Sequence, residues 1–219
     1  MISLETPPLL SLHDVTLIPA PISKVASREE CNPYYSKGLL PLATAPMDCV
    51  IDETNWEVFS KAGVLTVLPR TVEIKTRLHL MTKTFIGVSL KEFAEHFCAM
   101  KNAQDIFEAL DQNDLKAKVC VDVANGHMQA LIDLCRIAKD IFGERLILMA
   151  GNIANPMSYI QYANAGIDYV RVGIGTGSRC TTSANVAVHF PMASLLDSIR
   201  RIQMTANLPY YPKIVADGG

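Results

Sequence analysis

The sequence predicts an α/β fold, a parallel (β/α)8 barrel of the TIM type that is truncated after its seventh strand. Three observations carry this prediction: strand-like apolar runs alternate with helix-like stretches, the runs are apolar on both faces, and polar or glycine-bearing loops follow nearly every run. Continuous apolar strands are typical of a parallel sheet covered on both sides. Because functional side chains follow most strands rather than one switch point, the pattern favours a barrel over an open sheet.

Seven runs have the length and composition of strands. They are residues 40–45, 64–68, 84–88, 118–123, 146–150, 169–172 and 213–216. Helical patterning covers residues 55–61 and 128–142, a further helix is expected to start at Asn155-Pro156, and Gly63, Gly143 and Gly166 stand where helices end. An eight-stranded barrel needs one more strand and two more helices. We therefore expect residues 1–219 to form a single, C-terminally incomplete barrel domain, either a fragment or a chain that a second polypeptide completes.

Composition narrows the class of protein. The chain has 219 residues, 49% of them hydrophobic, and a net charge of -2, which gives no electrostatic case for binding nucleic acid or an anionic membrane. No apolar stretch approaches the roughly 20 residues of a membrane helix, and the first residues lack a signal-peptide pattern. The six cysteines show no CxxC spacing, which is typical of free thiols in a reducing cytosol. We expect a cytoplasmic protein.

The strongest local signal is the stretch GIGTGSRCTT at residues 173–182. Its alternating glycines let the main chain pass close to a ligand, and the hydroxyl of Ser178 could bind a phosphate. Nearby N–H groups or Arg179 could activate the thiol of Cys180 as a nucleophile. The dinucleotide fingerprint GxGxxG is not matched, so a flexible loop with an incidental cysteine stays open on this evidence alone.

This loop, preceded by VRV, resembles the cysteine loop of the IMP dehydrogenase/GMP reductase family. The resemblance extends along the chain, because SLHDVTLIPA, LPLATAPMDCV, VDVANGH, MAGNI and VADGG follow one another in the family's order and approximate spacing. Several motifs in order are far more specific than any one of them. The short gap between the second and third strands leaves no room for the CBS module of many IMP dehydrogenases.

The resemblance implies a purine nucleotide oxidoreductase. Cys180 would attack C2 of the purine of IMP or GMP, and Thr182 would assist proton transfer. The residues expected to bind the substrate are Met47, Ser178, Asp217, Gly218 and Gly219. Those expected near the nicotinamide cofactor, NADP or NAD, are Asp122, Asn152 and Arg171. A potassium ion would bind the main-chain carbonyls of Gly175, Gly177 and Cys180.

The motifs divide between the two enzymes of the family. VDVANGH and the missing CBS module are more similar to GMP reductase, which converts GMP to IMP with NADPH. The APMD segment, Arg171 and VADGG are more similar to IMP dehydrogenase, which converts IMP to XMP with NAD. We lean to the reductase and keep the dehydrogenase open.

A non-catalytic nucleotide-binding relative or subunit also stays open. The family's mobile flap would lie beyond Gly219, so we expect the isolated chain to be poorly active or inactive. Against a non-catalytic protein, Cys180, Thr182 and Asp217 are all present. The resemblance further implies a homotetramer.

Overall fold

The computed structural model describes residues 8–36, 38–177 and 187–218. These residues form one six-stranded sheet in the order β1-β2-β3-β4-β5-β6, with every neighbouring pair parallel. The strands are β1 (Val67–Leu68), β2 (Phe85–Val88), β3 (Ala117–Asp122), β4 (Leu146–Ile153), β5 (Tyr169–Val172) and β6 (Lys213–Ala216). The helices are α1 (Trp56–Lys61), α2 (Ile74–Leu80), α3 (Leu90–Phe93), α4 (Met100–Gln112), α5 (Gln129–Phe142), α6 (Ser158–Asn164) and α8 (Met192–Thr205).

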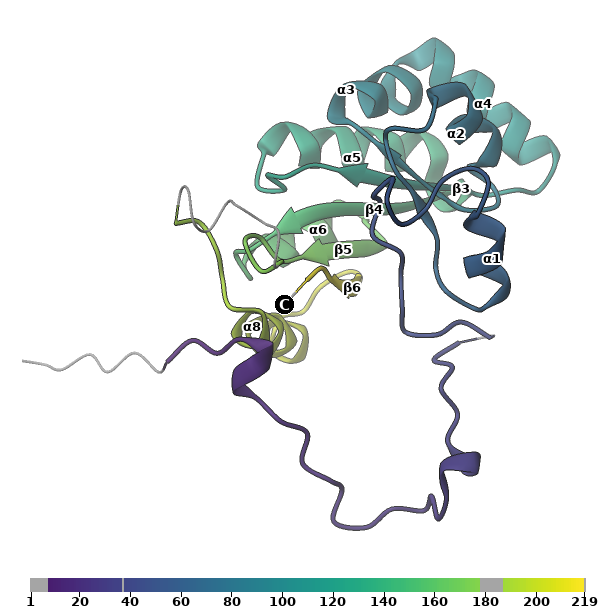
Figure 1. The fold of residues 1–219 in the computed structure, drawn as a ribbon. Coiled ribbons are helices and arrows are strands. Elements are labelled where there is room, and N and C mark those ends of the chain that lie inside the picture. The colour runs from purple at the N-terminus through teal and green to yellow at the C-terminus, as the bar shows by residue number, and fades with distance from the viewer. Residues whose placement is uncertain (1–7, 37, 178–186, 219) are drawn as a thin grey trace, which may run out of the picture.

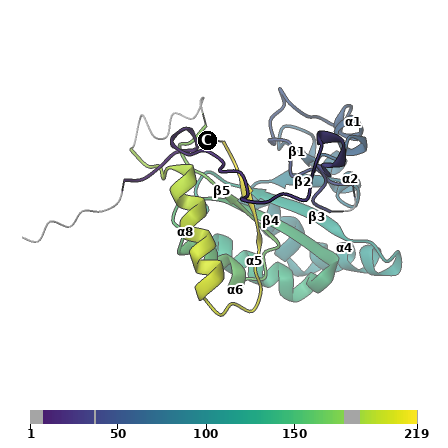
Figure 2. The ribbon, with the colours of Figure 1, turned by 90° about the horizontal axis from the view of Figure 1, so that it is seen from below.

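Each of the strands β1 to β5 is followed by at least one helix that returns the chain to the next parallel strand. Figures 1 and 2 show α2 to α6 along one side of a curved sheet, with α8 beside β6 at its edge. Strictly sequential strand order with helices on the outside is the arrangement of a (β/α) barrel rather than of a doubly wound sheet. The predicted fold class, part of a parallel barrel, is confirmed.

The expected first strand, residues 40–45, is corrected. This segment makes an isolated parallel bridge, in which the main-chain N–H of Thr44 donates to Leu65 O at 2.9 Å and that of Leu65 donates to Leu42 O at 3.0 Å. Pro41 and Pro46 flank the bridge and have no N–H to donate, which prevents a longer ladder. The described residues therefore form six strands and one extended, bridged segment instead of seven strands.

Helix positions agree more closely with the sequence. The helix expected over 128–142 is α5, which buries Leu131, Cys135 and Ala138 as its apolar spacing predicts. Gly63, Gly143 and Gly166 have φ angles of 80°, 50° and 72°, so each ends its helix in the left-handed region that glycine tolerates. The sequence analysis assigned no residues to α2, α3, α4 or α8.

The N-terminal residues 8–36 run outside the sheet as an extended segment with two short 3-10 turns, Leu12–Asp14 and Arg28–Glu30 (Figure 1). It is tied to the start of α8, because Leu10 donates to Ser194 Oγ at 2.8 Å and the Ser194 N–H donates to Leu10 O at 3.1 Å. Within the described part of the chain, no helix is long and apolar enough to cross a membrane.

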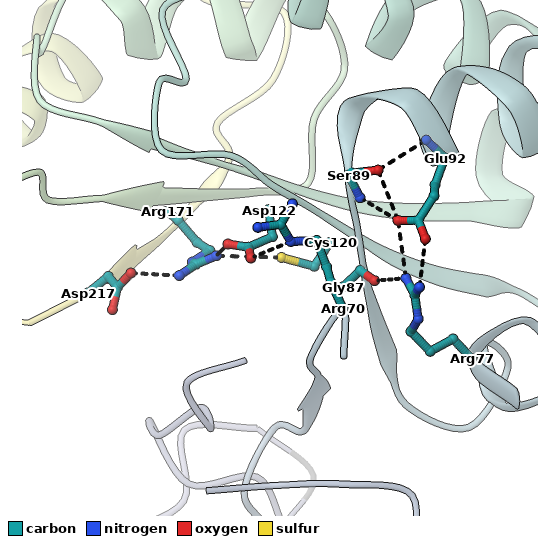
Figure 3. A network of polar contacts seen from close by, with 9 residues as sticks. All are labelled: Arg70, Arg77, Gly87, Ser89, Glu92, Cys120, Asp122, Arg171 and Asp217. Atoms are coloured by element: carbon teal, nitrogen blue, oxygen red, sulfur yellow. Dashed lines mark hydrogen bonds and ion pairs between the residues drawn. The ribbon is translucent and has the colours of Figure 1, made fainter. Parts of the chain in front are cut away.

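One buried ion pair joins α2 to the start of α3. The side chain of Arg77 is 2% exposed; its Nη2 donates to Glu92 Oε1 at 2.7 Å and its Nη1 donates to Gly87 O at the middle of β2 (Figure 3). Glu92 also accepts the main-chain N–H of Ser89 at 2.8 Å and so caps α3. Burial alone would raise the pKa of Glu92, but the hydrogen bonds from Arg77 and Ser89 lower it from 4.5 to about 2.

Candidate functional site

A cavity of about 330 Å³ lies at the C-terminal ends of the strands. The residues that line it come from the last residues of β3, β4 and β5 and from the segments that follow β1, β3, β5 and β6: Arg70, Asp122, Val123, Ala124, Asn152, Arg171, Gly173, Ile174, Gly175, Thr176, Gly177, Asp217 and Gly218. Barrel proteins build their active sites at this end of the strands. The cavity is therefore the candidate active site of the described residues.

A buried guanidinium occupies the centre of this site. Arg171, on β5, is 7% exposed; its Nη1 lies 2.6 Å from Asp122 Oδ1, and its Nη2 lies 2.6 Å from Asp217 Oδ2 (Figure 3). Burial alone would lower the pKa of Arg171, but the neighbouring Cys120 thiol and the two carboxylates raise it. The cation is thus held in place between the end of β3 and the segment after β6.

Asn152 ties the end of β4 to the same carboxylate. Its Nδ2 donates to Asp217 Oδ2 at 2.7 Å and to the main-chain oxygen of Gly173 at 2.8 Å. Asp217 consequently receives hydrogen bonds from two side chains, which leaves its other carboxylate oxygen, Oδ1, to meet a ligand.

The glycine loop after β5 approaches the main chain of β6 too closely for a larger residue. A Cβ at Gly173, whose φ is 121°, would lie 2.7 Å from Asp217 O and 2.9 Å from Thr176 Oγ1. Thr176 Oγ1 in turn donates to Asp217 O at 3.0 Å. Only glycine therefore fits at position 173, where the loop passes close to the main chain after β6.

Two further residues complete the polar network. The half-exposed side chain of Arg70 places its Nε 3.3 Å from Asp122 Oδ2. Cys120 Sγ lies 3.9 Å from Arg171 Nη1, and burial raises the pKa of this thiol to about 11, so it is a poor nucleophile. Arg70 follows the expected strand at 64–68, where functional side chains were predicted to gather, but no ligand contact was predicted for it or for Cys120.

Comparison with known proteins identifies the family to which the chain belongs. The family model for the IMP dehydrogenase / GMP reductase domain matches residues 9–219. The chain belongs to the IMP dehydrogenase/GMP reductase family. It is 28% identical to a GMP reductase of Buchnera aphidicola subsp. Schizaphis graminum, over 82% of this chain and 50% of that protein. It is 29% identical to a GMP reductase of Streptococcus pyogenes serotype M4, over 97% of this chain and 63% of that protein.

A solved structure is also similar. The crystal structure of an inosine 5′-monophosphate dehydrogenase from Legionella pneumophila superposes with a TM-score of 0.72 at 25% identity, covering 97% of this chain and 62% of that one. The chain thus spans between half and somewhat under two thirds of the length of these relatives. Members of this family are oxidoreductases, and the family resemblance stated from the motifs is confirmed.

The structure brings together most of the family-derived site residues that it describes. Those that line the one cavity are Asp122, Asn152, Arg171, Gly175, Gly177, Asp217 and Gly218. Met47 is not among the lining residues; it lies 47% exposed in the turn after the bridged segment, and its contact with the purine stays a prediction. The other predicted residues, Ser178, Cys180, Thr182 and Gly219, lie outside the described residues.

The expected potassium site is partly in view. Gly175 and Gly177, which would supply two of its three carbonyls, both line the cavity, whereas Cys180 would supply the third. Among residues 8–36, 38–177 and 187–218, no cluster of three His, Cys, Asp or Glu side chains could hold a metal ion. His127 has a structural explanation, since its Nε2 accepts the Ala154 N–H at 3.1 Å and its Nδ1 lies 2.9 Å from Ser158 Oγ.

A larger cavity, of about 940 Å³, opens between the bridged segment 40–46 and β6. It adjoins the candidate site, because Arg171, Asp217 and Gly218 line both cavities. At the other end, the Lys213 ammonium lies 5.4 Å from the ring centres of Tyr35 and Tyr169. Among the described residues β6 pairs with β5 alone, so this cavity lies beside the last strand of the sheet.

Proposed function

We propose that this chain forms the nucleotide-binding part of a purine nucleotide oxidoreductase that converts GMP to IMP with NADPH. The observation that carries the proposal is the Asp122–Arg171–Asp217 network in a cavity at the C-terminal ends of the strands of an IMP dehydrogenase/GMP reductase domain. Two relatives named GMP reductase support the choice of direction.

In this proposal the mononucleotide lies on the β6 side of the cavity. Asp217, whose Oδ2 is already engaged by Arg171 and Asn152, would accept hydrogen bonds from the ribose hydroxyls through Oδ1. Ser178 and the amides of Gly218 and Gly219 would bind the 5′-phosphate, which is an anchor remote from the reacting carbon. Met47 would contact the purine.

The chemistry would belong to Cys180 and Thr182. Addition of the Cys180 thiolate to C2 of the purine makes that carbon tetrahedral, and in the reductase direction the 2-amino group then leaves as ammonia while Thr182 assists proton transfer. A nicotinamide cofactor bound beside Asp122 and Asn152 would supply a hydride to C2, and the C2–sulfur bond would then break to release IMP and the Cys180 thiolate. Potassium at the carbonyls of Gly175, Gly177 and Cys180 would order the cysteine loop.

IMP dehydrogenase is the second candidate, because the solved structure reported above is an enzyme of that name. In that direction IMP, water and NAD give XMP and NADH through the same cysteine. The two candidates share the described site, so the substrate and cofactor pair distinguishes them.

Two absorbance assays at 340 nm test the proposal. One offers GMP with NADPH and the other IMP with NAD, each in potassium buffer, with Cys180→Ala as the control. Loss of absorbance with GMP, abolished in the variant, supports the reductase, and a gain with IMP supports the dehydrogenase. Binding of a purine nucleotide without turnover in either assay would contradict an enzymatic role for this chain on its own and favour a non-catalytic subunit or one that needs a partner chain. A companion sizing experiment tests the proposed homotetramer.

A further inference from the structure

The guanidinium of Arg171 is held by contacts within the protein. Its side chain is 9% exposed, and both of its Nη atoms are within 2.6 Å of a carboxylate oxygen. Nη1 also lies 3.9 Å from Sγ of Cys120, a buried residue of β3. Both Nη atoms of Arg171 are therefore engaged by carboxylates of the protein itself.

The two carboxylates it joins come from distant parts of the chain. Asp122 ends β3 and Asp217 follows β6, so two strands separate them in the sheet. A guanidinium is a rigid planar fork, and a fork bonded to one carboxylate at each Nη atom fixes the separation of the two. A shift of either carboxylate therefore changes the position of the other.

Each carboxylate has one further side-chain partner on its own side of the cavity. Arg70 Nε lies 3.3 Å from Asp122 Oδ2, and Asn152 Nδ2 donates to Asp217 Oδ2 at 2.7 Å. Neither of these partners bridges the two carboxylates in the structure. Arg171 is thus the link between the two halves of this network (Figure 3).

We infer that Arg171 is a positioning residue that couples the mononucleotide subsite at Asp217 to the dinucleotide subsite at Asp122. The inference rests on the proposed function, which places the two ligands against these two carboxylates. Its consequence is that a change at Asp122 alters mononucleotide binding, although Asp122 does not touch the mononucleotide. By the reciprocity of coupled binding, a change at Asp217 alters dinucleotide binding.

A double-mutant cycle tests the coupling by equilibrium binding of GMP and IMP to the full chain. Asp122→Asn is expected to weaken mononucleotide binding about tenfold in the otherwise unsubstituted chain, as for residues that share one network. In the Arg171→Lys background the same change is expected to have less than about a twofold effect, because an ammonium keeps the charge but cannot bridge two carboxylates as a fork.

Arg77→Lys is the matched control, since Arg77 is also buried and paired with a carboxylate but is not among the residues that line the cavity. In that background the tenfold effect of Asp122→Asn should persist. If Arg171→Lys does not fold, as circular dichroism would show, the reciprocal measurement still decides: Asp217→Asn should weaken NADP or NAD binding by a similar factor.

The outcomes separate the two proposals. Nucleotide binding by the unsubstituted chain, with an effect of Asp122→Asn that is absent or equal in all three backgrounds, refutes the role of Arg171 and leaves the proposed function standing. Absence of any purine nucleotide binding by the unsubstituted chain refutes the proposed function, and the inference with it.

Discussion

Glu92→Gln removes the negative charge beside the buried Arg77 and keeps the shape of the side chain. Arg77 would then remain as a cation that is 2% exposed, with carbonyl and amide oxygens as its only partners among the described contacts. Leaving a buried charge without its counter-charge is one of the few changes that destabilise a fold strongly. We expect a large fall in the free energy of unfolding.

The pKa of Glu92 sets the size of this effect. A fall in pKa from 4.5 to about 2 corresponds to about 3 kcal/mol of stability from the ionised form. Because the Glu92 side chain is 26% exposed, solvent screening reduces this to about 2 kcal/mol. The folded-state pKa is lowered, so this stability is present above about pH 4.5 and is lost as the pH falls toward 2.

Urea unfolding followed by circular dichroism measures both quantities. At pH 7 the variant should be less stable by about 2 kcal/mol, and the difference from the unsubstituted chain should shrink steadily below about pH 4.5. Glu57→Gln is the control, since Glu57 pairs with Lys61 on the exposed face of α1 and its loss should change stability by less than about 0.5 kcal/mol. Equal effects of the two changes, or a difference that does not depend on pH, would refute the reasoning.

Two further predictions concern packing, the first next to the site and the second at the opposite, N-terminal ends of the strands. Gly126→Ala would place a Cβ 2.5 Å from Asn152 O. We therefore expect thermal unfolding to show a free energy of unfolding lower by about 2 kcal/mol. An unchanged melting temperature would show that the loop moves to relieve the clash at little cost. Asp168→Asn breaks a 2.6 Å ion pair with the largely buried Lys139 and should cost about 1–2 kcal/mol. The same change at Asp197, in an exposed helical ion pair, should cost less than about 0.5 kcal/mol, and similar losses at both positions would contradict this account.

The parallel sheet and the gathering of the site could be predicted because they depend on local sequence. Continuous apolar runs specify strands covered on both faces, and residues directly after parallel strands must meet at one end of the sheet. The family resemblance assigned Asp122, Asn152, Arg171 and Asp217 to the substrate and cofactor sites, and all four line one cavity. Their individual contacts with ligands stay predictions.

What the sequence did not reveal depends on pairings between distant residues. Residues 40–45 have the apolar character of a strand, but the two prolines that flank the Ala43–Leu65 bridge limit their pairing to that bridge. Arg77 lies in an amphipathic stretch that does not by itself predict a buried cation. It is buried because folding brings Glu92 and the main chain of Gly87 next to it. The bridging role of Arg171 likewise requires the order of the strands in the sheet.

The central claim is that a purine nucleotide binds against Cys180 at the C-terminal end of this half-barrel. Iodoacetamide labelling, with peptide mass spectrometry to measure the rate at each cysteine, tests it without requiring turnover. We predict that saturating GMP or IMP slows labelling of Cys180 and leaves the exposed Cys31, in the N-terminal segment, unchanged. Labelling of Cys180 at the same rate with and without either nucleotide would contradict the account.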